Sequence, residues 1–71
     1  MPTIYWLIAK YADELDCTHV TFTATDAVDA AAKARYWNNY HDKRDRPGYG
    51  WQIAVEAPAG VEPRYDYMFK H

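Results

Sequence analysis

The sequence has little of what marks secreted, membrane or disulfide-bonded proteins. Only one of its 71 residues is cysteine, Cys17, which excludes an internal disulfide. No apolar run is long enough to span a bilayer, and no segment has the pattern of a secretory signal peptide. We therefore expect a cytoplasmic protein in a reducing setting, with no membrane association.

Strong charge of either sign is also missing. Eight Lys and Arg against ten Asp and Glu give a formal net charge of −2 and a pI near 5.8. The chain lacks the basic footprint of a general nucleic-acid binder and the dense acidity of a polyanion mimic. Charge alone therefore selects no class of partner.

Catalytic motifs are absent as well. Cys17 and His19 form the only short-range pair of nucleophile and base, and on a strand they share a face. No oxyanion donor or orienting third residue accompanies them, so we favour a structural thiol. The segment GYG at 48–50 lacks the lysine and the helix N-terminus that a phosphate loop needs.

The potential metal ligands lack the spacing of a metal site. The acidic loop has no calcium-loop pattern, and the sequence contains no CxxC or HxxxH pair. We therefore predict no catalytic residue, no metal and no cofactor, in a protein that is not an enzyme. The ligands considered are Asp13, Glu14, Asp16, Cys17, His19, His41 and His71.

Aromatic residues, in contrast, are abundant. Three Trp and seven Tyr, with a hydrophobic share of 49%, exclude a disordered chain. The length predicts a single compact domain over residues 1–71. At this size one core contributes only a few kcal/mol, and a partner or a second copy often supplies the rest.

Four segments have the residue pattern of β-strands. Residues 4–12 carry apolar side chains on both faces, which is typical of a central strand. Residues 19–25 alternate cleanly and would form a hairpin with the first segment. Residues 51–57 and 64–70 are the third and fourth expected strands.

A single helix is expected between the second and third strands. Thr25 or Asp26 is a suitable N-cap, Asp29 complements the helix dipole, and the helix should begin near Ala27. The segment DKRDRPGYG ends it. Trp37 lies at the edge of the helical stripe that would face the sheet, which consists of Ala27, Ala30, Ala31, Ala34 and His41.

The element order β-β-α-β-β predicts an α+β fold. A right-handed crossover makes the second and third strands run in the same direction, and the doubly apolar first strand fits between them. We therefore predict a four-stranded antiparallel sheet of order 2-1-3-4 with one helix packed on one face.

One helix covers only one face of this sheet, so the faces must be assigned. We take the more regular sets as buried, although a fourth strand turned over would place its tyrosines on the open face. The expected core residues are Ile4, Trp6, Ile8, Val20, Phe22, Trp51, Ile53, Val55, Tyr65, Tyr67 and Phe69.

The open face is the first predicted binding surface. Contiguous rings and aliphatic side chains with a polar rim are typical of interaction surfaces. A homodimer is the favoured occupant, because two-fold self-association is the commonest way to bury such a face. The predicted partner-binding residues here are Tyr5, Leu7, Tyr11 and Met68, beside Ala9 and Ala54.

The helix end and the following loop form a second predicted surface. Tyr and Arg are the residue types that anchor protein interfaces. The competing interpretation is a solvated helix end, with Asp42 and Asp45 diluting the basic charge. The residues of this surface are Tyr36, Tyr40, Lys43, Arg44, Arg46 and Tyr49.

Single-stranded nucleic acid, RNA in particular, is the alternative partner. Tyrosines on an open sheet face stack bases, and Lys10, Lys70 and the basic loop 43–46 would attract phosphates. The net negative charge and the missing signature of RNA-recognition sheets count against it.

The sequence thus predicts a non-enzymatic protein-binding domain, an adaptor or inhibitor that docks a protein partner through exposed aromatic side chains. In size and layout it resembles the small phage-encoded inhibitors of host or defence complexes, anti-CRISPR proteins among them. The resemblance is one of architecture without a sequence motif, so no family is assigned.

Overall fold

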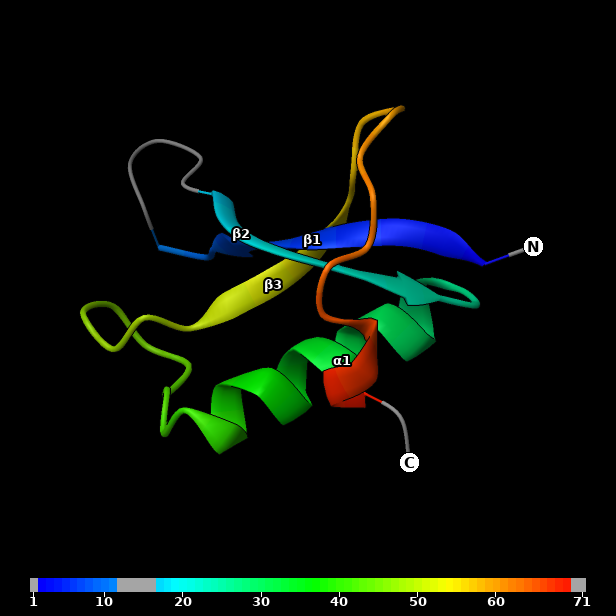
Figure 1. The fold of residues 1–71 in the computed structure, drawn as a ribbon. Helices are drawn as coiled ribbons and strands as arrows, with labels where there is room; N and C mark the ends of the chain where they lie inside the picture. The colour runs from blue at the N-terminus through cyan, green and yellow to red at the C-terminus, as the bar shows by residue number, and fades with distance from the viewer. Residues whose placement is uncertain (1, 12–16, 70–71) are drawn as a thin grey trace.

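The fold is a three-stranded sheet with one α-helix along one face (Figure 1). The computed structural model describes residues 2–11 and 17–69, apart from the side chains of residues 17–19. β1 lies between β2 and β3, and both pairings are antiparallel. The elements are β1 (Thr3–Ala9), β2 (Cys17–Ala24), α1 (Ala27–Tyr40), β3 (Gln52–Glu56) and the 3-10 helix η1 (Asp66–Phe69).

The α+β class and the antiparallel sheet are confirmed, but the four-stranded sheet of order 2-1-3-4 is wrong. The described part of the predicted fourth strand, residues 64–69, contains η1 instead. Tyr65, Met68 and Phe69, spaced i, i+3 and i+4, turn toward the core, whereas Tyr67 is 68% exposed. The segment fits this helical spacing as well as period two, and burial of the helical set decides the outcome.

The faces of β1 are opposite to those predicted. Tyr5 pairs with Phe22, and the helix-covered face carries Tyr5, Leu7 and Phe22, with Leu7 fully buried (0% exposed). Because β1 is apolar on both faces, its own alternation does not show which face is inside. The pairing register with β2, which has one apolar face, decides it. Ile4 and Trp6 consequently lie half-buried on the other face.

β3 is also turned over relative to the prediction. Ala54 packs against the core, whereas Ile53 and Val55 are 36% and 37% exposed. The register pairs Ile53 with Ile8, which places both on the face away from α1. Small side chains on α1 and at Ala54 allow the helix to lie close to β3, so the larger aliphatic side chains are left outside.

The core lies between α1, the inner face of the sheet and η1. Phe22 is at its centre, with its ring centroid 4.8 Å from that of Phe69 and 6.2 Å from that of Tyr5. Full burial of a side chain of this size contributes about 1.5–3 kcal/mol to stability. The buried cluster consists of Leu7, Val20, Phe22, Ala24, Ala30, Ala34 and Phe69.

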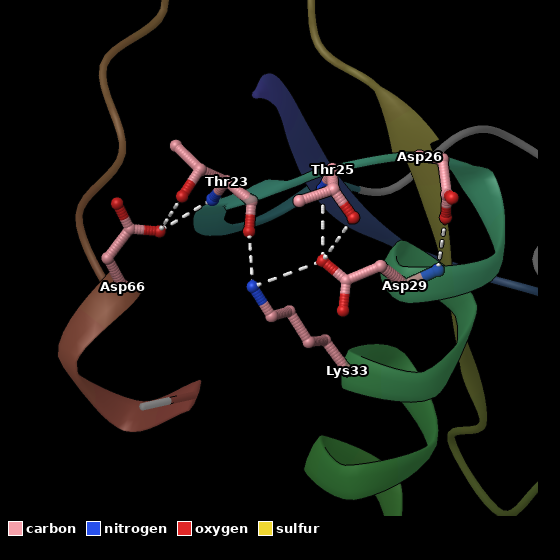
Figure 2. Close-up of polar contacts among 6 residues, drawn as sticks. All are labelled: Thr23, Thr25, Asp26, Asp29, Lys33 and Asp66. Carbon is pink, nitrogen blue, oxygen red and sulfur yellow. Dashed lines mark hydrogen bonds and ion pairs between the residues drawn. The ribbon is translucent and has the colours of Figure 1, made fainter. Parts of the chain in front are cut away.

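α1 begins where the sequence predicts, at Ala27 with Asp26 as N-cap (Figure 2). The Asp29 N–H donates to Asp26 Oδ1 over 2.8 Å, and Asp29 Oδ2 accepts from the Thr25 N–H over 3.0 Å. The bond from the Thr25 N–H is the main reason why the pKa of Asp29 is lowered, and Lys33 makes a smaller contribution. Both donors lie at the positive end of the helix dipole, where carboxylates stabilise a helix.

The outer edge of β2 is covered by the C-terminal segment. The N–H groups of Arg64 and Tyr65 both donate to Thr21 O, and the Thr23 N–H donates to Asp66 Oδ1 over 2.5 Å (Figure 2). Thr21 O and the Thr23 N–H are thus satisfied without a fourth strand, and the segment that covers them protects this part of the edge from pairing with another chain.

Candidate protein-binding surfaces

The predicted helix-end residues lie at the surface and form what we call the helix-end surface. Its three tyrosines, Tyr36, Tyr40 and Tyr49, are 42%, 68% and 48% exposed. Arg44 and Arg46 are exposed and Lys43 is partly buried. The members are Tyr36, Tyr40, Lys43, Arg44, Arg46 and Tyr49.

Tyr36 and Tyr40 come together as a stacked pair. One turn apart on α1, their ring centroids are 6.3 Å apart with an interplanar angle of 22°. The ring of Tyr36 also meets Phe69 edge-on at 6.1 Å, so the pair rests on the core. Both rings are therefore held in place while a large part of their surface faces solvent.

The second part of the surface is the loop after α1. The Lys43 N–H donates to Asn38 O over 2.8 Å, and a backbone bridge joins Arg44 to Gly50. The guanidinium of Arg46 lies 4.4 Å from the ring centroid of Tyr49, a cation–π contact. The helix-end surface therefore has a second side-chain pair, in which a cation lies over an aromatic ring.

Asn38 is a structural residue that the sequence analysis missed. It is 0% exposed, and its side chain donates to Gln52 O over 2.8 Å and accepts from the Gln52 N–H over 2.9 Å. Asn38 follows Ala34 by four residues and Ala30 by eight, so it lies on the same buried side of α1 as these alanines. This helical spacing could have predicted its burial. The amide fixes the end of α1 to the start of β3 and so positions the loop between them.

Asp45 binds residues just beyond the end of β1 and not the basic residues of its own loop. Its Oδ1 accepts from Lys10 Nζ over 2.7 Å and from the Tyr11 hydroxyl over 2.6 Å. The bond from Lys10, and then that from Tyr11, lowers the pKa of Asp45 below its usual value, and the same contact raises the pKa of Lys10. One of the two carboxylates expected to dilute the basic charge is therefore neutralised by another partner.

We expect the contact at Asp45 to weaken in acid. Because folding lowers this pKa, its contribution to stability is complete above the unfolded value of about 4 and is lost as pH falls through the folded value. The groups are exposed, so the effect should be small and screened by salt. The measurement is the urea midpoint from pH 7 to pH 2 for the wild type and Asp45→Asn. Equal urea midpoints of the wild type and Asp45→Asn at pH 7 would show that the contact at Asp45 does not stabilise the fold.

The basic side chains of the helix-end surface have no acidic partner in the described part of the chain. Among the described residues, Lys10 and Lys33 form ion pairs with Asp45 and Asp29, whereas Lys43, Arg44 and Arg46 form none. Their charges are available to acceptors on another molecule.

The open face of the sheet carries different residues from those predicted. Tyr5 and Leu7 lie beneath α1, and Met68 packs against the core from η1, so their placement on this face is wrong. Tyr11 is 44% exposed just beyond the end of β1. The open face as the structure has it carries Ile4, Trp6, Ile53 and Val55, together with Ile8, which is 6% exposed.

A groove of about 550 Å³ runs between α1 and β3. Ala27, Val28, Ala31 and Arg35 line it from the helix, and Ala54 lines it from the strand. Val28 is 78% exposed. The groove is thus mainly apolar, with the cationic Arg35 on its helical wall. The carboxylate of Asp45 also lines it and is already paired with Lys10.

The residues considered for chemistry form no site in the described part of the chain. No group of three or more His, Cys, Asp or Glu side chains that would hold a metal occurs there. No described helix has the length and apolar character that crossing a bilayer requires. The predictions for Asp13, Glu14, Asp16, Lys70, His71 and the side chains of Cys17 and His19 lie outside the described residues.

No protein-family model, curated protein or solved structure matches this chain. Its function must therefore be argued from its own surfaces.

Proposed function

We propose that this chain is a small non-enzymatic protein-binding domain, an adaptor or inhibitor that docks a protein partner through the helix-end surface. The stacked pair of Tyr36 and Tyr40 carries the proposal. The ring of Tyr36 rests on Phe69 and that of Tyr40 stacks on Tyr36, and yet the two side chains are 42% and 68% exposed. Ordered aromatic side chains lose little conformational entropy on binding and commonly dominate interface energetics.

The partner surface should be acidic beside an apolar crevice. The three cations of the loop form no ion pair among the described residues, so carboxylates on a partner would complement them. A crevice of ring size would take the exposed Tyr40. The resemblance to phage-encoded inhibitors remains a prediction from size and layout.

Nucleic-acid binding loses one of the features that supported it. The sequence analysis placed Tyr5 on the open face as a base-stacking ring, but Tyr5 lies on the face covered by α1. Trp6 is the aromatic member of the open face instead. Nucleic-acid binding is therefore one of the outcomes that the experiment below distinguishes.

The test begins with a photocrosslinking amino acid at position 40, which identifies the contacted protein, and then measures affinity with that purified protein. Tyr40→Ala and Arg44→Glu should each weaken binding at least about tenfold, as for anchor residues at other interfaces. Ala59→Lys changes an exposed residue in another loop and should have no effect. Far-ultraviolet circular dichroism must show that all variants are folded.

Two results would overturn the proposal. The first is equal affinity of the wild type, Tyr40→Ala and Arg44→Glu for the purified protein. The second is salt-sensitive binding of an oligouridine strand that Arg44→Glu abolishes, which would assign the surface to nucleic acid.

A further inference from the structure

The outer edge of β3 has unpaired backbone groups. Lys10 N–H donates to Trp51 O and Ala57 N–H donates to Ile4 O, so the residues of β3 bonded to β1 are Ile53 and Val55. The N–H and C=O groups of Gln52, Ala54 and Glu56 consequently point away from the sheet. Asn38 satisfies those of Gln52, whereas no hydrogen bond within the described residues engages those of Ala54 and Glu56.

The contrast with the other edge is informative. The C-terminal segment covers β2, but β3 ends the sheet with donors and acceptors that are ready to pair. An exposed edge of this kind is a template for another strand. The question is which strand fits it.

We propose that β3 pairs antiparallel with β3 of a second copy of this chain. The two-fold axis passes through the pair that Val55 forms with Val55 of the second copy. The two three-stranded sheets then form one sheet of six strands. This inference concerns β3 alone and does not rest on the function proposed for the helix-end surface.

The backbone groups favour this register. Ala54 lies opposite Glu56 of the second copy, and each such pair exchanges two bonds, so all four free donors and all four free acceptors are satisfied. Gln52 lies opposite Pro58 of the second copy. Pro58 has no N–H and Gln52 is already satisfied by Asn38, so the ladder ends without an unpaired donor.

The neighbouring registers fit less well. Centring the axis on Ala54 requires the groups of Gln52 that Asn38 occupies. Centring it on Glu56 places two like charges directly opposite each other, which destabilises a strand pair.

Charge complementarity supports a second copy as the occupant. The side chains of Ala54 and Glu56 project to the helix side of the sheet, since they alternate with Val55. Glu56 of the second copy would therefore point toward the groove that Arg35 lines. Neither Arg35 nor Glu56 forms an ion pair among the described residues, and the symmetry creates the Arg35–Glu56 pair twice.

The apolar surfaces beside the edge would be buried by the same pairing. On the open face, Val55 would meet Val55 of the second copy, next to Ile53. On the helix side, the exposed Val28 and Ala31 of the two α1 helices would face each other across the groove. Pairing at β3 thus covers exposed aliphatic side chains on both faces of the sheet.

The experiment is the solution mass of the full chain by light scattering and sedimentation from about 1 to about 500 μM, a range that spans weak and moderate self-association. We expect a monomer–dimer equilibrium. Ala54→Pro removes an outward N–H and no bond to β1, so the variant should remain folded and be monomeric. Glu56→Arg should weaken the dimer at least about tenfold, and Arg35→Glu with Glu56→Arg should restore it.

The matched control is Glu62→Arg, the same charge reversal at an exposed residue away from β3. It should leave the dimer constant unchanged. A wild type that is monomeric at every concentration would overturn the inference, as would a dimer that survives both Ala54→Pro and Glu56→Arg. A dimer lost in Tyr40→Ala but kept in Glu56→Arg would place self-association on the helix-end surface instead and also overturn it.

Discussion

Leu7→Asp is expected to leave the chain unfolded at 25 °C. Leu7 is 0% exposed in the centre of the core, so the variant loses a buried leucine and places an unpaired carboxylate in apolar surroundings. The first loss alone costs about 2–5 kcal/mol, and burial of the charge adds to it. A domain of this length has only about 4–10 kcal/mol of stability in total. Circular dichroism and urea unfolding measure the outcome.

The matched control is Ile53→Asp, an aliphatic residue of the neighbouring strand on the opposite face. Ile53 is 36% exposed, so its carboxylate remains in contact with water and the domain should stay folded. A Leu7→Asp variant with the urea midpoint of the wild type would show that the face assignment of β1 is wrong.

The sequence was sufficient for the elements that depend on local signals. α1 was predicted to begin at Ala27 because a capping aspartate and a dipole-facing carboxylate are local signals. The hairpin and the third strand were predicted from period-two alternation. Each of these features depends on neighbouring residues, which a single sequence contains.

Which face of β1 and of β3 is buried depends on information that local sequence patterns lack. In β1 both faces are apolar, and in β3 the aliphatic residues Ile53 and Val55 face away from the helix. Only the register between strands settles such cases, because a shift of one residue exchanges the two faces. The fourth strand was lost for a similar reason, since Tyr65, Met68 and Phe69 are compatible with two periods.

The predictions for the two binding surfaces had different outcomes for the same reason. The helix-end tyrosines were predicted to face outward from helical geometry alone, and Tyr36 and Tyr40 do so as a stacked pair. The open-face residues were assigned through the undecided strand faces, and Tyr5 and Leu7 are inside. The free edge of β3 was not predicted, because it follows from the order of strands and the route of the C-terminal segment.

Asn38→Leu is expected to destabilise the domain by about 2–6 kcal/mol, from one unsatisfied donor and one unsatisfied acceptor at about 1–3 kcal/mol each. The buried amide of Asn38 engages both backbone groups of Gln52, and leucine of similar volume satisfies neither. Asn39→Leu is the matched control, because Asn39 is exposed and its substitution should change stability by less than about 0.5 kcal/mol. Urea unfolding of the three proteins gives the comparison.

Asn38→Asp separates the hydrogen bonds from packing, because aspartate nearly preserves the shape of the side chain. Its ionised carboxylate still accepts from the Gln52 N–H but faces the Gln52 carbonyl without a proton to donate. The protonated form donates to that carbonyl, so folding should raise the pKa of the new carboxyl group, and the deficit relative to the wild type should shrink as pH falls through the raised value. Asn38→Leu has no such group and should show no matching recovery. Equal deficits of the Asp variant at pH 7 and pH 4 would contradict a role for the Asn38 donor and leave its shape as the reason for its burial.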